Sequence, residues 1–190
     1  RLKLNEWKQG RFALIKHELS DTNSLSSGNI YSLTQDRQSN IWVGTTTGLS
    51  YFNPEQQKFT SIKYRADTAG LAANNVFGMT EDKKGHVWVG TTAGASEFDK
   101  NWKWIRTLSE DNHVEPTAPS LSDDSVYDIA IAENGDVWFA TGNGLDRFHK
   151  KTGLMMHYQY DESNNKSLSE NLVFTLLFDT NGDLWVGTAD

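Results

Sequence analysis

The side chains that could carry acid–base or metal chemistry are five histidines and an excess of carboxylates. The histidines are His17, His86, His113, His149 and His157, and they are scattered without the spacing of a zinc-ligand pair such as HExxH. The chain has no cysteine, and therefore neither a thiolate metal site nor a disulfide. Neither a GxSxG nucleophile motif nor a phosphate-binding loop occurs. The sequence predicts no catalytic residue and no cofactor.

One acidic turn resembles the start of a calcium-binding loop. Asp179, Asn181 and Asp183 have the D-x-N-x-D spacing, but the bidentate glutamate that completes such a loop is missing. In a related turn, Ala132 replaces the first aspartate. Asp, Asn and Gly are also the residues that close tight hairpins. We therefore interpret these segments as hairpin turns and predict no metal site.

These turns belong to a segment that the chain repeats four times. The tryptophans Trp42, Trp88, Trp138 and Trp185 are spaced by 46, 50 and 47 residues. Each copy reads as a strand (30–35 in the first copy), a polar turn and a tryptophan-bearing strand (41–45), and in the first three copies two further strands follow. A period of this length with four strands inside it is typical of a propeller blade. The predicted fold is all-β, a β-propeller of four-stranded antiparallel blades in which the recurring indoles pack blade against blade.

The predicted domain spans residues 1–190 and contains three whole blades and two half blades. The repeats lie near 25–64, 71–108, 121–160 and 168–190, and residues 1–17 resemble the outer strands of a preceding blade. The two halves could pair to close a four-bladed ring. We favour an arc cut from a larger ring of about seven blades. The chain, which starts at Arg1, also reads as an excised segment. The open strand edges of such an arc would need the remaining blades or a partner to cover them.

Charge and hydropathy narrow the classes of partner. The formal net charge of −7 argues against binding to nucleic acid or to an anionic membrane surface. No apolar stretch reaches 18 residues, the length at which a membrane-spanning helix is expected. We therefore expect no nucleic-acid partner and no direct contact with a membrane.

Residues that differ between the copies at one end of the predicted ring are the candidate ligand-binding residues. That end carries the loops that lead into the first strands and the turns between the second and third strands. One of these loops (107–120) is longer than its counterparts. A polar rim with one enlarged loop is a plausible ligand mouth, although solvated loop residues would look the same. An exposed tryptophan between the third and fourth strands could stack on a sugar ring or contact a neighbouring blade. The candidates are Asn29, Asn75, Trp102, His113, Asp124, Asn143 and Asn171.

The repeat resembles the two-component regulator propeller of bacterial sensor proteins. In the second copy the matching residues are Val76, Asp82, Gly85, Val87, Trp88, Val89, Gly90, Thr91, Gly94 and Phe98. The resemblance implies a non-enzymatic sensing module in the periplasmic part of an inner-membrane protein. In that family the ligand is often an oligosaccharide. The signal passes to downstream domains of the same protein, commonly a histidine kinase or a diguanylate cyclase, and a homodimer is possible.

Two other functions stay open at this point. A lyase or hydrolase built on a propeller would need histidine and acidic side chains that converge at the channel mouth, where His113 is the one histidine expected. A protein-interaction scaffold would instead present a broad apolar patch on the rim.

Overall fold

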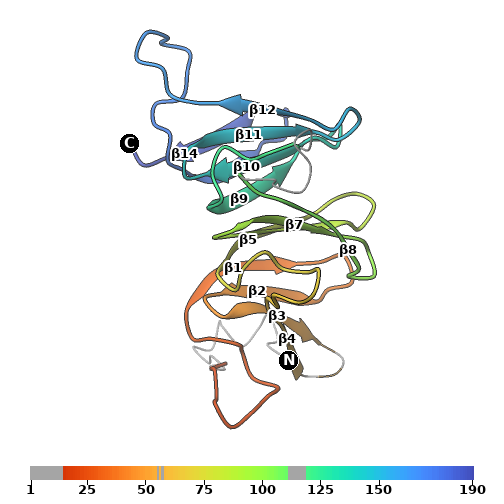
Figure 1. Cartoon of the computed structure of the whole chain (residues 1–190). Helices are drawn as coiled ribbons and strands as arrows, with labels where there is room; N and C mark the ends of the chain where they lie inside the picture. Colours follow the sequence, from red (N-terminus) through yellow and green to blue (C-terminus); the bar gives the residue numbers. More distant parts are fainter. Residues whose placement is uncertain (1–14, 55, 57, 111–118) are drawn as a thin grey trace, which may run out of the picture.

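The structure, a computed structural model, describes residues 15–54, 56, 58–110 and 119–190, and in these it consists of antiparallel sheets (Figure 1). The first blade has the order β1 (Ile30–Gln35), β2 (Ile41–Thr45), β3 (Gly48–Asn53), β4 (Lys58–Ile62). The second is β5 (Val76–Glu81), β6 (Val87–Thr91), β7 (Gly94–Phe98), β8 (Trp104–Leu108), and the third is β9 (Val126–Ile131), β10 (Val137–Thr141), β11 (Gly144–His149), β12 (Leu154–Tyr158). A two-stranded sheet, β13 (Val173–Phe178) and β14 (Leu184–Thr188), follows. The predicted all-β blades are confirmed. The expectation of outer strands over 1–17 lies, for residues 1–14, outside the described residues.

Two fourth strands end earlier than the repeat predicts. The first and third predicted repeats extend to residues 64 and 160, whereas β4 ends at Ile62 and β12 at Tyr158. The backbone N–H groups of Tyr64 and Tyr160 donate instead to side-chain oxygens of the next repeat. The chain therefore leaves the sheet there and crosses to the following blade.

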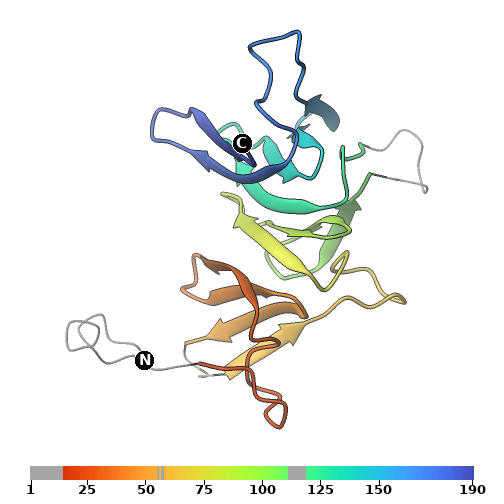
Figure 2. The same cartoon turned by 90° about the vertical axis from the view of Figure 1, so that its left-hand side faces the viewer.

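The blades stack with their first strands side by side, as the two views in Figures 1 and 2 show. In every blade the pairing of the first and second strands shifts register at one residue, which is the mark of a β-bulge. The residue that the pairing skips is aromatic each time. These rings form one continuous row, with centroids 5.0, 5.2 and 5.3 Å apart, through Tyr31, Phe77, Tyr127 and Phe174. The bulge thus aims one aromatic side chain of each blade at its neighbours along the inner strands.

The repeated tryptophans lie between blades, as predicted, wherever a following blade is present. Trp42 is 3% exposed and Trp88 is 0% exposed, because the next sheet covers each of them. Trp138 is half-buried against the last sheet, and its ring stacks on Tyr158. Trp185 is 65% exposed, since no described sheet follows it. Burial of the indole therefore depends on the next blade.

The other end of the stack exposes the complementary apolar face. Leu33 is 67% exposed, while its counterparts Met79, Ile129 and Leu176 are 4–8% exposed. Within the stack, this face of one blade packs on the tryptophan face of the blade before it. One end of the arc thus exposes the tryptophan face, at Trp185, and the other end exposes the face that carries Leu33. Inside the stack these two kinds of face pack against each other. In the described part of the chain, no helix has the length and apolar character of a membrane span.

The acidic turns have the hairpin structure that the sequence predicts. In the first blade, Asp36 accepts hydrogen bonds from the backbone of Gln38 and Asn40 and from the indole Nε1 of Trp42 at 2.9 Å. Asp179 binds its own turn and the indole of Trp185 in the same way. The carboxylate oxygens are committed to the turn and the neighbouring strand, which explains why aspartate recurs there.

Small residues in the second strands allow the blades to approach one another. A Cβ atom added at Gly44 would lie 2.8 Å from the carbonyl oxygen of Val76 in the next blade. At Gly90 the corresponding distance, to the carbonyl of Val126, is 2.7 Å. Both are shorter than any real Cβ contact, so the spacing between blades requires glycine at these positions.

Candidate functional site

The rim that holds the predicted ligand mouth, here called the axial rim, is tied together by backbone hydrogen bonds. Thr46 of the β2–β3 turn donates its N–H to the carbonyl of Asn29, and Thr92 donates to the carbonyl of Asn75. Gly142 donates to Ser125 in the third blade. The loops that lead into the inner strands therefore lie beside the β2–β3, β6–β7 and β10–β11 turns, as expected.

Three of the predicted residues on this rim use their side chains to hold the fold. Asp124 accepts a hydrogen bond from the N–H of Glu110 at 2.7 Å, and Asn171 accepts one from Tyr160 at 2.7 Å. The Asn143 amide donates to the carbonyl of Ser122. These oxygens and amides fasten the crossover between blades, a role that the repeat pattern by itself does not reveal.

The side chains of Asn29 and Asn75, also on the axial rim, make no hydrogen bond within the described residues. The Asn75 Oδ1 atom is buried and has no hydrogen-bond partner, a state that costs free energy unless a ligand or water satisfies it. Asn29 is exposed, and within the described residues its side chain makes no hydrogen bond. The predicted residue His113 lies outside the described residues. Within the described residues, the fold therefore uses neither of these two side chains in a hydrogen bond.

Trp102 lies on the opposite rim, which is formed by the β1–β2 and β3–β4 turns and their counterparts and is here called the turn rim. Its backbone has φ 63°, a left-handed conformation that is uncommon for a bulky residue. The ring crosses to the first blade and stacks on Trp42, with centroids 3.9 Å apart and planes at 25°. Trp102 therefore makes the predicted contact with a neighbouring blade. This contact leaves open space beside the ring.

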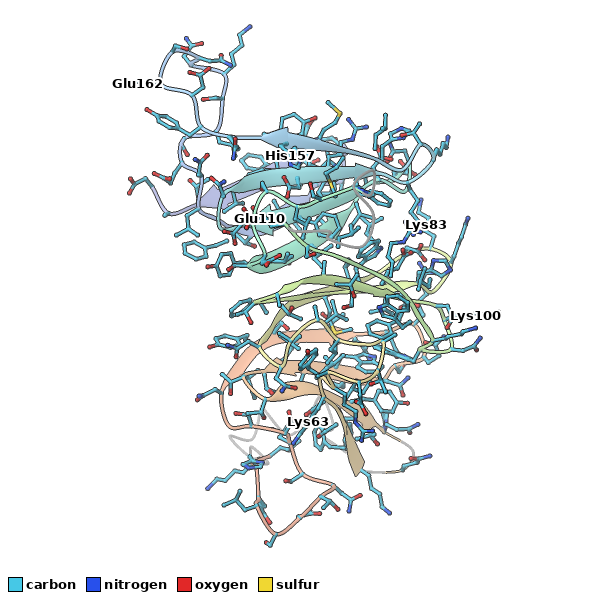
Figure 3. All side chains as sticks on the ribbon, in the orientation of Figure 1. Lys63, Lys83, Lys100, Glu110, His157 and Glu162 are labelled. Carbon is cyan, nitrogen blue, oxygen red and sulfur yellow. The ribbon has the colours of Figure 1, made fainter. Side chains whose placement is uncertain are left out.

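A cavity of about 430 Å³ opens beside this stack, between the first and second blades. We call it the first groove; it is lined by Asp36, Gln38, Asn40, Trp42, Tyr51, Thr60, Ile62, Lys100 and Trp102. Its volume falls in the range of about 300–1,000 Å³ that small-molecule sites occupy. Lys100 projects from the same edge of the molecule as Lys83 (Figure 3). Sequence reasoning singled out Trp102 but missed this groove, because the groove joins residues of three strands and two turns from two blades.

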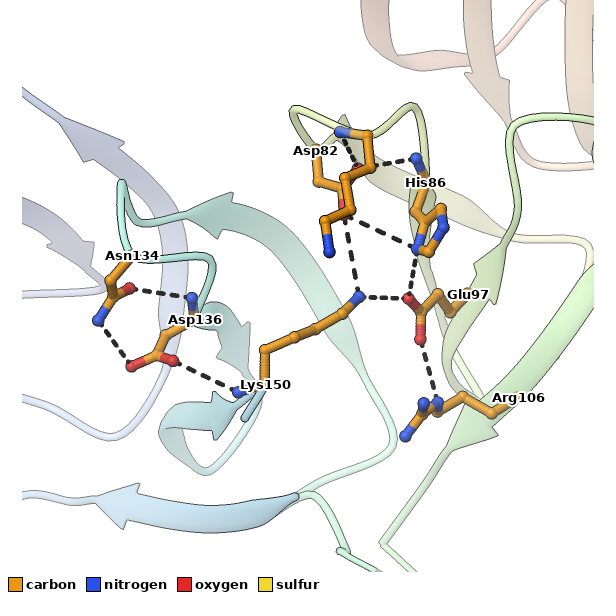
Figure 4. A network of polar contacts seen from close by, with 8 residues as sticks. Asp82, His86, Glu97, Arg106, Asn134, Asp136 and Lys150 are labelled. Atoms are coloured by element: carbon orange, nitrogen blue, oxygen red, sulfur yellow. Dashed lines mark hydrogen bonds and ion pairs between the residues drawn. The ribbon is translucent and has the colours of Figure 1, made fainter. Parts of the chain in front are cut away.

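The equivalent position between the second and third blades, the second groove, is filled by charged side chains (Figure 4). Glu97 is 1% exposed, and its carboxylate meets Lys150 Nζ at 2.5 Å, Arg106 Nε at 3.0 Å and His86 Nδ1 at 3.3 Å. Lys150 comes from the third blade and also lies over the Trp88 ring, 5.6 Å from its centroid. A buried carboxylate is tolerated when cations surround it in this way.

A second ion pair lies next to this network in the third blade. Arg147 donates from Nε and Nη2 to Asp136 Oδ2, at 2.9 and 2.6 Å. Burial by itself would raise the pKa of Asp136, but the hydrogen bonds from Arg147 and Asn134 outweigh it and the pKa is lowered. Asp136 also accepts the backbone N–H of Lys150, so the pair fixes the turn that delivers the Lys150 ammonium to Glu97.

The third blade also contains a buried aspartate, serine and histidine in contact. Asp146, 0% exposed, accepts hydrogen bonds from Ser122 N and Oγ, and its other oxygen lies 2.7 Å from His157 Nδ1. Burial is the largest influence on this carboxyl and raises its pKa. A serine nucleophile needs the histidine beside its hydroxyl. Here the aspartate stands between them, so the group does not form a catalytic triad. Within the described residues, no cluster of three or more His, Asp or Glu side chains could hold a metal ion.

With this geometry established, comparison with known proteins identifies the family. The two-component regulator propeller family matches four segments, residues 24–47, 70–93, 120–143 and 167–190. The chain belongs to this family. Each matched segment begins in the loop before a first strand and ends at or just past the turn after the second strand, so the family repeat falls at the same place in each of the four sheets and covers its first two strands. No curated protein sequence matches significantly.

Solved structures extend this result. The extracellular domain of BT4673 from B. thetaiotaomicron, a proposed hybrid two-component system, is 26% identical with a TM-score of 0.70, over 87% of this chain and 21% of that one. The extracellular domain of BT3049 from the same organism gives 22% identity and a TM-score of 0.67, over 92% and 22%. Virginiamycin B lyase from Staphylococcus aureus gives 18% and 0.61, over 90% and 51%, which shows a shared fold alone. The chain thus spans about a fifth of the two extracellular domains.

Proposed function

We propose that this two-component regulator propeller is a ligand-sensing module of a bacterial signal-transduction protein. The observation that carries the proposal is the match of the four family repeats in register with three stacked four-stranded blades and the two-stranded sheet that follows them. The similarity to the extracellular domain of BT4673, at 26% identity, supports an extracytoplasmic position, which we assign to the periplasm. The module itself is proposed to be non-enzymatic and to take a small molecule such as an oligosaccharide.

The physical mechanism is a shift between arrangements of the module and the rest of its protein. A ligand can shift such an equilibrium only by the difference between its affinities for the two states. Blades that meet through side chains, as at Trp88 or Lys150, offer contacts that a ligand wedged between them can strengthen or weaken. Downstream domains, a kinase or cyclase output and a homodimer would transmit the change.

Calorimetric titration of the full chain against a panel of oligosaccharides tests the proposal. We expect saturable binding of at least one member, together with a rise in melting temperature, because a ligand that binds the folded state alone stabilises it. If a properly folded chain, whose far-ultraviolet spectrum reports β-structure, binds no member of the panel, direct sensing of sugars is rejected.

A lyase function has less support from the arrangement of the residues. The similarity to virginiamycin B lyase, at 18% identity, concerns the fold. Of the described histidines, His157 makes the shortest contact with a carboxylate, and there Asp146 separates it from the nearest serine hydroxyl. Turnover of any cyclic or sugar substrate by the full chain would restore this alternative.

A further inference from the structure

The first and second grooves are built on the same frame. The register of the strand pairs makes Tyr51 and Thr60 the counterparts of Glu97 and Arg106. By the same repeat alignment, Asn40 corresponds to His86, and Lys100 to Lys150. Each groove thus has one turn, three strands and a lysine from the following blade. The difference between the two grooves must come from the side chains on this frame.

In the second groove those side chains fill the space. Glu97 draws in Lys150, Arg106 and His86, whose nitrogens lie 2.5 to 3.3 Å from its carboxylate oxygens and so offset its buried charge. In the first groove the counterpart of Glu97 is Tyr51, which offers no carboxylate. Among the described residues, no carboxylate therefore draws in Lys100, the lysine of this groove, and the space stays open.

The polar groups that line the first groove fall into two sets. Asp36 is fully engaged, because its oxygens accept from two backbone N–H groups, from the Asn40 amide and from the Trp42 indole. Within the described residues, the side chain of Gln38, the Oδ1 atom of Asn40 and the hydroxyl of Thr60 have no hydrogen-bond partner. The groove therefore offers both donors and acceptors to a ligand with several hydroxyl groups.

The lysine of the first groove lacks an ion-pair partner for the same reason, although the Asp36 carboxylate, which is committed to its own turn, also lines the groove. Of the described carboxylates, none lies within 4.0 Å of the Lys100 ammonium, whereas Lys150 in the second groove has both Glu97 and Asp82. Glu81 lies in the small adjoining pocket and is bonded to the backbone N–H of Arg37. An anionic group on a ligand would supply the charge that Glu97 supplies in the second groove.

We propose that the first groove binds an acidic sugar of one or two rings. A sugar ring has an apolar face that packs on aromatic side chains, here Tyr51 and Trp102, while its hydroxyls bond to polar neighbours. Its carboxylate meets Lys100. The volume of about 430 Å³ suits a ligand of this size. The inference rests on the proposed sensing function and places the ligand on the turn rim rather than at the axial rim.

The test uses uronate disaccharides, digalacturonate and dimannuronate, with galactobiose and mannobiose as the neutral counterparts. The readout is the set of indole N–H resonances of the seven tryptophans in the full chain, assigned by Trp42→Phe and Trp102→Phe. We expect a uronate to shift the Trp42 and Trp102 signals more strongly than its neutral counterpart. If none of the four sugars shifts either signal, the inference is overturned.

Variants separate the groove from its surroundings. Lys100→Ala should weaken uronate binding about tenfold, as the loss of a hydrogen bond to a charged group does. Lys103→Ala, which removes an exposed lysine three residues away, should leave it unchanged. Thr60→Trp should block the groove, and Thr60→Phe, which is smaller and also uncharged, serves if the larger ring prevents folding. Binding that survives both Thr60 variants overturns the proposal.

The same titrations distinguish a failure of the groove assignment from a failure of the proposed sensing function. If calorimetry detects a sugar whose binding is lost in Asn75→Ala but kept in Thr60→Trp, the sensing function stands and the groove assignment is wrong. If the folded chain binds no sugar in either assay, both are wrong. If Thr60→Trp abolishes and Lys100→Ala weakens binding that Asn75→Ala keeps, both are supported.

Discussion

Truncation of equivalent tryptophans tests how the blades are held together. Trp88 is 0% exposed and packs edge-on against Phe139 and Phe148 of the next blade, with ring centroids 5.3 and 6.1 Å away. An indole buries about 150–250 Å², which at about 25 cal/mol per Å² corresponds to about 4–6 kcal/mol. Mutational experience for Trp→Ala in a core gives about 3–5 kcal/mol. We therefore expect Trp88→Ala to lower the free energy of unfolding by about 4 kcal/mol.

Trp185→Ala is the matched control, because it removes the same side chain from the same repeat position. Trp185 is 65% exposed, so its truncation removes only about a third of the buried indole area. The free energy of unfolding should therefore fall by about 1 kcal/mol. Urea unfolding measures both values. For a chain of this size the melting temperatures should fall by about 8–16 °C and about 2–4 °C. If Trp88→Ala does not fold, Trp88→Phe replaces it, with a smaller loss. Equal costs at the two positions would refute packing of each indole by the following blade.

Three other predictions concern the ion network, the buried aspartate and one turn. Lys150→Met should lower the free energy of unfolding by about 2–3 kcal/mol. In a double-mutant cycle, adding Glu97→Gln should recover at least about 1 kcal/mol of this loss, because the double variant has no unpaired carboxylate. Additive effects of the two substitutions would argue against the pair. The raised pKa of Asp146 means that the folded chain holds this proton more tightly than the unfolded chain does. Its contribution is therefore present below the usual value of 3.8 and is lost as pH rises through the raised pKa; unfolding measured from pH 3 to 7 should lose this component in Asp146→Asn. Gly94→Ala should destabilise the fold by more than about 2 kcal/mol, because its φ is 103° and the new Cβ would clash with a backbone carbonyl. The control Gly28→Ala, which has open space around it, should change stability by less than about 0.5 kcal/mol. Similar melting temperatures for the two variants would contradict this prediction.

The fold could be predicted from the sequence because each blade repeats the same turn and strand motifs. The aspartate turn, the tryptophan strand and the glycine turn recur, and the bounds of β1 and β2 are those that the pattern predicts. The ends of β4 and β12 were wrong by two residues, since the hydrogen bonds that divert the chain come from Asn74 and Asn171 in the following repeat. Such bonds depend on the arrangement of blades and leave no periodic signal.

The grooves could not be derived in the same way. Whether a groove is filled depends on Tyr51 or Glu97 together with a residue on the adjacent strand and a lysine from the next blade. The register must be known before these positions can be grouped. One signal was present in the sequence: the repeat position of Tyr51 carries Glu97 in the second copy and Arg147 in the third, a variation in charge at an otherwise regular site. Trp102 was found for its chemistry, although its left-handed backbone and its stack on Trp42 were not foreseeable.

A crystal structure of the full chain with digalacturonate tests the central claim most directly. The account predicts electron density for the sugar in the first groove, against Tyr51 and Trp102 and with a carboxylate beside Lys100. It also predicts that the second groove remains filled by Lys150 bound to Glu97. Sugar density at the axial rim, or a first groove closed by its own side chains, would contradict it.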